Sequence, residues 1–141
     1  DKKTLVGYAH TRNGEAHNAF NSPKPMYVDP DKGTKYLNKP VIVLIDRGSY
    51  SATTFFSLAS KSIPNIILVG DTTGGGGGMP NGGQLPNGWI YRFTFTRMLD
   101  VNMNDYAEKG VPPAIKVSFD WSDLTHDAII DRAVSEILNK E

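Results

Sequence analysis

The hydrophobic pattern is clearest in the middle of the chain, where it predicts a strand, a helix and a second strand. An unbroken apolar run, Val41–Ile45, follows Pro40 and is typical of a strand covered on both faces. The next apolar residues have the spacing of one helix face; they are Ala52, Phe55, Phe56, Ala59 and Ile63. Pro64 ends this helix, since the residue before a proline disfavours helical geometry. A second buried strand at 66–69 ends at Gly70, so the segment predicts a βαβ unit with a right-handed crossover.

Shorter segments on both sides predict further strands. The runs 5–8 and 26–28 are strand-like, and 115–119 alternates between apolar and polar residues. In 89–96 every odd position is aromatic, which predicts a strand with one buried face. We expect Trp89, Tyr91, Phe93 and Phe95 in the core rather than in a platform for nucleic-acid bases, because no basic stripe accompanies them.

The C-terminal residues predict an amphipathic helix near 125–139, with Thr125 as a candidate N-cap. Its inward-facing residues are expected to be Ala128, Ile129, Ala133, Val134, Ile137 and Leu138. Loops are expected at 71–88 and 100–110. No repeat or linker divides the chain, so we predict a single domain, residues 1–141, of the α/β or α+β class with a mixed sheet.

Composition excludes several classes of protein. Fifteen basic and fifteen acidic side chains cancel, which argues against binding nucleic acid or an anionic membrane by bulk charge. The sequence has no cysteine for disulfides or thiolate metal sites, and no apolar run long enough to span a membrane. The histidines, His10, His17 and His126, lack ligand spacing, so a metal site is not expected. The sequence starts with neither a methionine nor a signal peptide, and we therefore expect a fragment of a longer protein.

Ser51 lies where the first buried strand turns into the helix. Gly48 permits a sharp turn there, and the serine hydroxyl is expected at the rim of the sheet. Backbone amides of the first helical turn, starting with Ala52, would face a developing oxyanion. Some serine hydrolases place their nucleophile in this way, although their G-x-S-x-G string is absent. The alternative is that Ser51 or Ser49 only caps the helix.

Five consecutive glycines, 74–78, follow the second buried strand. A phosphate-binding P-loop would need a lysine opening a helix, and no lysine lies between Lys61 and Lys109. The remaining interpretations are a backbone segment that lets a peptide approach closely and a plain mobile loop. Glu108 by itself is typical of a solvated loop carboxylate.

Four segments together resemble the C-terminal processing (tail-specific) serine peptidases and their tricorn-core relatives. They are the strand Val41–Ile45, the turn Gly48-Ser49-Tyr50-Ser51-Ala52-Thr53, the segment Val69-Gly70-Asp71-Thr72-Thr73-Gly74 and the segment Glu108-Lys109-Gly110-Val111-Pro112-Pro113. The family pattern has a buried strand, G-S-x-S-A-S/T, V-G-E/D-x-T before a glycine loop, and E-x-G-V-x-P, in the same order. The resemblance covers about half of the chain and implies a ClpP/crotonase-like fold.

The resemblance also implies roles for individual residues. The nucleophile would be Ser51, and the backbone N–H of Ala52 would be one oxyanion donor. The substrate-binding loop would include Gly74, Gly75 and Gly76. The processing peptidases carry a lysine base in this loop, at the position of Gly76, so a serine–lysine dyad is ruled out here. The tricorn-core-like branch uses an upstream histidine and a glutamate that Glu108 matches.

The function that the resemblance implies is a serine endopeptidase that forms an acyl-enzyme on Ser51 and uses no metal or cofactor. The general base and the D-x-R-x-N-x-G-G segment of the other oxyanion donor would lie upstream, so this chain alone would be inactive. Its partners would be a peptide or protein substrate, held as an added strand, and the remainder of the polypeptide or an oligomeric partner. The family implies an extracytoplasmic location, in the periplasm or cell envelope.

Two other functions stay open at this point. The first is a non-catalytic peptide- or ligand-binding module on the same scaffold, because a fold does not fix a function. The second is a structural or ligand-carrying domain whose aromatic strand, 89–95, lines an apolar cavity.

Overall fold

The computed structural model describes residues 3–30, 32–33 and 39–139 and forms a mixed α/β fold. In chain order its elements are β1 (Thr4–Thr11), β2 (Lys24–Val28), β3 (Val41–Ile45), α1 (Ala52–Ser60), β4 (Ile66–Gly70), β5 (Pro80–Gln84), β6 (Ile90–Thr94), β7 (Thr96–Leu99), β8 (Ile115–Lys116) and α2 (Ala128–Leu138). The predicted βαβ unit and C-terminal helix are both confirmed.

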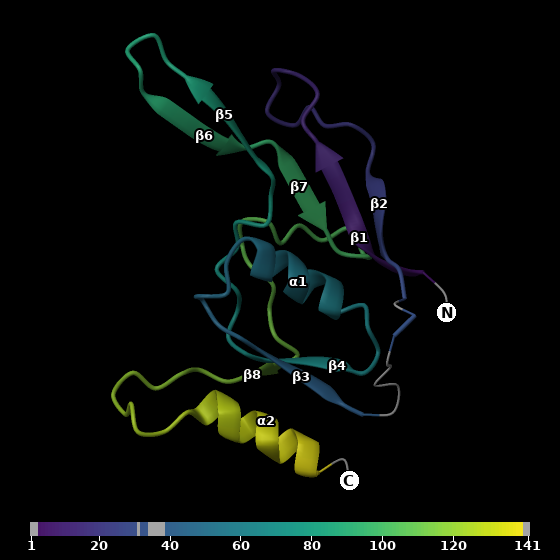
Figure 1. Cartoon of the computed structure of the whole chain (residues 1–141), viewed down its shortest axis with the longest axis vertical. Helices are drawn as coiled ribbons and strands as arrows, with labels where there is room; N and C mark the ends of the chain where they lie inside the picture. Colours follow the sequence, from purple (N-terminus) through teal and green to yellow (C-terminus); the bar gives the residue numbers. More distant parts are fainter. Residues whose placement is uncertain (1–2, 31, 34–38, 140–141) are drawn as a thin grey trace.

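The described strands lie in three separate sheets. β2, β1 and β7 form an antiparallel sheet, β3, β4 and β8 form a parallel sheet, and β5 pairs with β6 in a hairpin. The hairpin extends away from the parallel sheet, while α1 and α2 lie on opposite faces of that sheet (Figure 1). Parallel and antiparallel pairs therefore occur in different sheets rather than in the single mixed sheet that was predicted.

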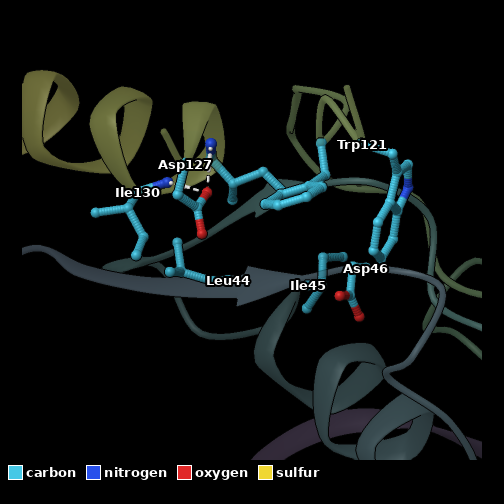
Figure 2. A pocket seen from close by; sticks show the side chains of 8 residues that line it. Leu44, Ile45, Asp46, Trp121, Asp127 and Ile130 are labelled. Carbon is cyan, nitrogen blue, oxygen red and sulfur yellow. Dashed lines mark hydrogen bonds between the residues drawn. The ribbon is translucent and has the colours of Figure 1, made fainter. Parts of the chain in front are cut away.

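The hydrophobic core is formed by Ile45, Leu58 and Leu68 of the βαβ unit together with Val111, which precedes β8 in the chain. The prediction that β3 is covered on both faces is wrong for Leu44, whose exposed fraction is 44%. Leu44 faces a hollow of about 270 Å³ that separates β3 from the start of α2 (Figure 2). On the side of α1, Ile45 is buried and packs with Leu58, whereas Val41 at the start of β3 is exposed.

The buried face of α1 differs from the apolar face that was predicted. The buried residues are Thr54, Ser57, Leu58 and Ser60, whereas Phe56 is 54% exposed. Ser57 Oγ donates a hydrogen bond to Thr53 O at 2.8 Å. Small polar side chains can be buried here because their hydroxyls have partners, which hydrophobic periodicity does not register.

The β5–β6 hairpin contradicts two predictions. β5 lies inside the predicted loop 71–88, and it pairs with β6 from Pro80↔Thr94 to Gln84↔Ile90. The aromatic residues of the next segment were expected in the core, but Trp89 is 71% exposed and Phe93 52%. Alternation correctly indicated a strand, but it does not determine whether another element covers one face.

The C-terminal helix α2 begins later than predicted, with Asp127 as its N-cap. Asp127 Oδ1 accepts hydrogen bonds from Ile129 N at 2.9 Å and Ile130 N at 3.1 Å (Figure 2). The predicted cap, Thr125, instead donates its hydroxyl to Asp123 Oδ1 at 2.6 Å. An aspartate at this position accepts from two first-turn amides, which explains why the helix starts there.

Packing in the C-terminal part is looser than predicted. α2 buries Ile129 and Ala133, but Val134, Ile137 and Leu138 are exposed. β8 has two residues, shorter than the predicted strand 115–119. Neither of the described helices is long and apolar enough to cross a membrane.

Candidate active site

Asp46 organises the turn that leads from β3 to α1. Its Oδ1 accepts hydrogen bonds from Gly48 N at 2.9 Å and from Ser49 N at 3.0 Å, and Ser49 Oγ accepts from Asp46 N at 3.2 Å. This is an Asx turn, which aspartate favours. The hydroxyl of Ser49 therefore belongs to the turn and does not cap α1.

Ser51 ends this turn in a strained backbone conformation, with φ 58° and ψ −114°. Such a conformation costs a residue with a Cβ about 1–3 kcal/mol. Ser51 occupies the N-cap position of α1, but its side chain makes no capping hydrogen bond, and the residue is exposed. The alternative that this serine is merely a helix cap is therefore wrong. A strained strand-to-helix turn with an exposed hydroxyl is instead the arrangement of a nucleophile elbow.

Backbone amides of α1 lie directly after Ser51. Thr53 N donates to Tyr50 O and Phe55 N donates to Ser51 O, both at 3.2 Å. Ala52 N–H is a first-turn amide, and such amides have no acceptor within their own helix. The helix dipole favours negative charge at this end. This position is suitable for the predicted oxyanion donor, and the role itself stays a prediction.

The glycine loop is bound to the serine turn through main-chain hydrogen bonds. Ser51 N donates to Gly75 O at 2.9 Å, and Gly74 N donates to Ser49 O at 2.8 Å. Tyr50 and Gly75 also form a parallel bridge. These groups of Gly74 and Gly75 are used within the chain. Of the three predicted substrate-binding glycines, Gly76 is the one that lines the hollow beside Ser51.

Two buried threonines hold the loop in place. Val111 N donates to Thr73 Oγ1 at 2.8 Å, and Thr73 Oγ1 lies 3.1 Å from Thr54 Oγ1. Thr54 Oγ1 in turn donates to Gly75 O at 2.7 Å. Because each hydroxyl has one proton to donate, these contacts form a chain of hydrogen bonds, the threonine chain. It runs from Val111 N through the hydroxyls of Thr73 and Thr54 to Gly75 O, the carbonyl that also accepts the Ser51 N–H. Sequence reasoning missed this chain; its only signal was a threonine one helical turn after Ser51.

The ring of Tyr50 lies over Gly76. A Cβ at Gly76 would lie 2.6 Å from both Oη and Cε2 of Tyr50, and Gly76 has φ +66°. A side chain at position 76 could exist only if the Tyr50 ring moved. The space that a loop lysine would need is therefore occupied, which gives a physical reason for glycine at this position.

A hollow of about 220 Å³ opens beside Ser51. It is lined by Ser51, Ala52, Phe55, Gly76, Gly77, Gly78, Met79, Pro80 and Met98. This lining is mainly apolar, and three of the lining residues are glycines, which have no side chain. Such a hollow can accept an apolar side chain next to the Ser51 hydroxyl.

Glu108 is exposed and lines a different hollow, together with Arg12, Phe20 and Arg97. Its backbone, however, reaches the serine site: a Cβ at Gly75 would lie 2.6 Å from Glu108 O. The main chains of Ser51, Gly75 and Glu108 are therefore neighbours. The side chains of Ser51 and Glu108 line separate hollows.

Histidines line neither of these two hollows in the part of the chain that the structure describes. His10 lies 6.1 Å from the Phe20 ring, and His126 Nε2 lies 3.1 Å from Asp131 Oδ2. The hollow between β3 and α2, with Leu44, Trp121 and Ile130, lies on the opposite face of the sheet from α1 (Figures 1 and 2). It is not part of the Ser51 site.

The fold is that of a family of serine peptidases. The chain belongs to Peptidase family S41, whose family model matches residues 1–117. The predicted resemblance to the C-terminal processing peptidases is confirmed by this match and by relatives that carry that description.

Two relatives in sequence are a carboxy-terminal processing protease, CtpA, of Bacillus subtilis (strain 168) and an uncharacterized protein of Chlamydia muridarum. The chain is 26% identical to CtpA over 91 residues, which is 64% of this chain and 20% of that protein. It is 29% identical to the Chlamydia protein over 148 residues, which is 96% of this chain and 23% of that protein. The chain thus spans about a fifth of the length of these curated relatives.

Solved structures support the same family. A crystal structure from Parabacteroides merdae, assigned provisionally as a peptidase, is 38% identical with a TM-score of 0.92, over 100% of this chain and 45% of that chain. Mature CPAF complexed with lactacystin is 26% identical with a TM-score of 0.67, over 86% of this chain and 24% of that chain.

Proposed function

We propose that this chain carries the nucleophile of a serine endopeptidase, and that Ser51 forms the acyl-enzyme. The observation that supports this most is the strained Ser51 turn, with an uncapped, exposed side chain beside an apolar hollow. Strain of this kind persists only where the surrounding structure enforces it. The main-chain bonds and the threonine chain around Gly75 provide that enforcement.

In the proposed reaction Ser51 Oγ attacks a peptide carbonyl while an imidazole takes its proton. The tetrahedral oxyanion is held by the Ala52 N–H, and losing one such donor typically costs about 3 kcal/mol. The imidazole then protonates the leaving amine, and water hydrolyses the acyl-enzyme by the reverse sequence. Glu108 would orient this base, as in the tricorn-core-like branch.

The base and the second oxyanion donor would come from the rest of the full-length protein. We therefore place this chain in the C-terminal part of a ClpP/crotonase-like catalytic domain. Because the chain spans about a fifth of its curated relatives, the activity, the protein substrates and an extracytoplasmic location are proposals for the whole protein. Cell fractionation followed by immunoblotting would test the location.

A fluorophosphonate probe tests the nucleophile. We expect it to label Ser51 in the full-length protein and to leave the Ser51→Ala variant unlabelled. Ser49→Ala is the matched control, because Ser49 lies in the same turn but its hydroxyl belongs to the Asp46 turn. Mass spectrometry of the labelled peptide would locate the adduct. Full labelling of Ser51→Ala would remove the assignment.

A second candidate is a peptide-binding module without catalysis. It is favoured by one observation: neither lysine nor histidine lines the hollow at Ser51 among the described residues. In that case the full-length protein would bind peptides in calorimetry, and the probe would label no residue.

A further inference from the structure

The segment that carries Glu108 is joined to the glycine loop by a main-chain hydrogen bond. Gly77 N donates to Ala107 O at 3.0 Å, and Ala107 is buried. Gly77 lines the hollow beside Ser51, whereas Ala107 lines the hollow of Glu108. This hydrogen bond therefore connects the walls of the two hollows.

Asp105 fixes the direction of the chain at Ala107. Its Oδ1 accepts a hydrogen bond from Ala107 N at 3.0 Å, which closes an Asx turn. Asp105 also forms an antiparallel bridge with Leu99, the last residue of β7. Both main-chain groups of Ala107 are thus bound, the N–H to Asp105 and the carbonyl to Gly77 N. The Asx turn therefore sets the position of the carbonyl that Gly77 needs.

Arg97 restrains the other oxygen of the Asp105 carboxylate. Arg97 Nε lies 3.7 Å from Asp105 Oδ2, and the guanidinium carbon lies 4.3 Å from the centroid of the Phe20 ring. Both side chains of the ion pair are partly exposed, so the pair itself contributes little to stability. The hydrogen bond from Ala107 N is therefore the main contact of this carboxylate.

The same segment also packs against the part of the glycine loop that holds Ser51. A Cβ at Gly75 would lie 2.6 Å from Glu108 O and 3.1 Å from Ala107 O. Gly75 O in turn accepts the Ser51 N–H at 2.9 Å. Because these main chains are in close contact, a displacement of the Asx turn would be transmitted to the loop and to Ser51.

Asp123 forms a comparable Asx turn that does not reach the glycine loop. Its Oδ1 accepts from Thr125 N at 3.0 Å, the same distance as in the Asp105 turn. This turn precedes α2, and neither of its two residues lines the hollow of Ser51 or that of Glu108. The Asp105 turn differs because the residue that it holds, Ala107, is buried and bonded to the glycine loop.

We infer that Asp105 is a positioning residue for the Ser51 site. Through Ala107 its carboxylate holds Gly77 in the wall of the hollow that takes the substrate side chain. Asp105 itself does not line that hollow. Loss of the Asx turn should therefore affect both the reactivity of Ser51 and the selection of the side chain. This inference rests on the proposed function of Ser51.

Two conservative substitutions in the full-length protein separate the turn from the charge. Asp105→Glu keeps the charge but moves the carboxylate one methylene further from the backbone, so that it no longer closes the Asx turn. We expect kcat/KM for a peptide and the rate of fluorophosphonate labelling to fall about fivefold, which corresponds to one net hydrogen bond. Asp105→Asn loses the charge but keeps an oxygen that accepts from Ala107 N, so it should retain most of the activity.

The preference for a substrate side chain distinguishes positioning from a general loss of stability. Two peptides are compared that differ only in having leucine or alanine at the residue that enters the hollow. The wild-type protein should prefer leucine, because the apolar hollow buries its larger side chain. In Asp105→Glu the ratio of the two kcat/KM values should fall about fivefold, because the wall at Gly77 is displaced. Partial unfolding would lower both values by the same factor and leave the ratio unchanged.

Asp123→Glu is the matched control, since it opens an Asx turn outside the Ser51 site and should change neither the rates nor the ratio. An unchanged ratio in Asp105→Glu would overturn the inference. An Asp105→Asn variant as impaired as Asp105→Glu would also overturn it, because the charge rather than the turn would then matter. If neither peptide is cleaved in a Ser51-dependent way, the proposed function fails, whereas Ser51-dependent cleavage with an unchanged ratio makes only this inference fail.

Discussion

Tyr50 and Gly76 form a tight pair beside the nucleophile. The ring fills the space where a Cβ at position 76 would lie, and Gly76 itself has a positive φ. We predict that Gly76→Ala lowers the free energy of unfolding by about 1–3 kcal/mol beyond the cost of the positive φ alone. It should also slow labelling of Ser51, since a displaced ring disturbs the loop that holds Ser51 N. Thermal unfolding and probe kinetics measure both effects.

Gly88→Ala is the matched control for this prediction. Gly88 has φ +89°, but the nearest atom to its added Cβ is Gln84 Nε2 at 3.9 Å, so only the backbone cost applies. In a Tyr50→Ala background, Gly76→Ala should cost no more than Gly88→Ala does. Equal costs for Gly76→Ala and Gly88→Ala in the wild-type background would show that Tyr50 leaves room for a side chain.

At the scale of elements, α1, the glycine loop and the segment at Val111 are joined by the buried hydroxyls of Thr54 and Thr73. Thr54→Val keeps the shape but leaves the Gly75 carbonyl and the Thr73 hydroxyl with one partner fewer. We predict a loss of about 1–3 kcal/mol in the free energy of unfolding. Labelling of Ser51 should slow as well, because Gly75 O also positions Ser51 N.

Thr53→Val provides the comparison on the same helix. Thr53 is exposed, so its substitution should change the free energy of unfolding by no more than about 0.5 kcal/mol. Denaturant unfolding of both variants decides the matter. If Thr54→Val and Thr53→Val were equally stable, the threonine chain would have no role in holding the loop.

The elements that the sequence predicted well are those with a strong local signal. The run Val41–Ile45, Gly48 and the approach to Pro64 together located the βαβ unit and the turn at Ser51. Signals of this kind depend on residues that are close together in the sequence, so they can be interpreted without knowing how the elements pack. The candidate nucleophile was accessible to sequence reasoning for this reason.

The errors arose where a tertiary contact decides the outcome. β5 contains Pro80, Gly82 and Gly83, which have low strand propensity, and pairing with β6 overrides that preference. Thr54 is polar, yet it is buried because Gly75 O accepts its proton. Asp127, rather than the predicted Thr125, caps α2 because its carboxylate accepts hydrogen bonds from two backbone amides. Such choices depend on partners that are distant in sequence or on competition between neighbouring caps.

At the scale of the molecule, the described residues divide into a covered region and an open one. The core at Ile45, Leu58, Leu68 and Val111 includes residues of β3 and α1, the two elements that the Ser51 turn connects. The hairpin and the groove between β3 and α2 instead expose large apolar side chains, including Trp89, Ile90 and Trp121. The elements on both sides of the candidate nucleophile thus contribute to the core, and the open part is where a substrate or the rest of the polypeptide would bind.

The acid stability of the molecule depends in part on Asp100, which is buried at the end of β7. Burial acts to raise the pKa of Asp100, but hydrogen bonds from the Asn104 side chain and backbone and from Asn102 N, together with Lys61, outweigh it, so the pKa is lowered. A lowered pKa in the folded state means that the ionised group stabilises the fold. This stabilisation is complete above the unfolded value of about 3.9 and is lost as the pH falls through the folded pKa.

We therefore predict that Asp100→Asn lowers the free energy of unfolding by about 1 kcal/mol at neutral pH, since a carboxylate that accepts several bonds is replaced by an amide. The difference from wild type should shrink as the pH falls below about 4, because the carboxylate is then protonated first in the unfolded state, and in the folded state only as the pH passes its lowered pKa. Urea unfolding measured at neutral pH and at several acidic values would follow this change. Asp29→Asn, at an exposed carboxylate, removes the same charge and should show a much smaller effect at neutral pH. A difference that stayed constant with pH would contradict this prediction, because it would mean that the ionisation of Asp100 does not contribute to stability.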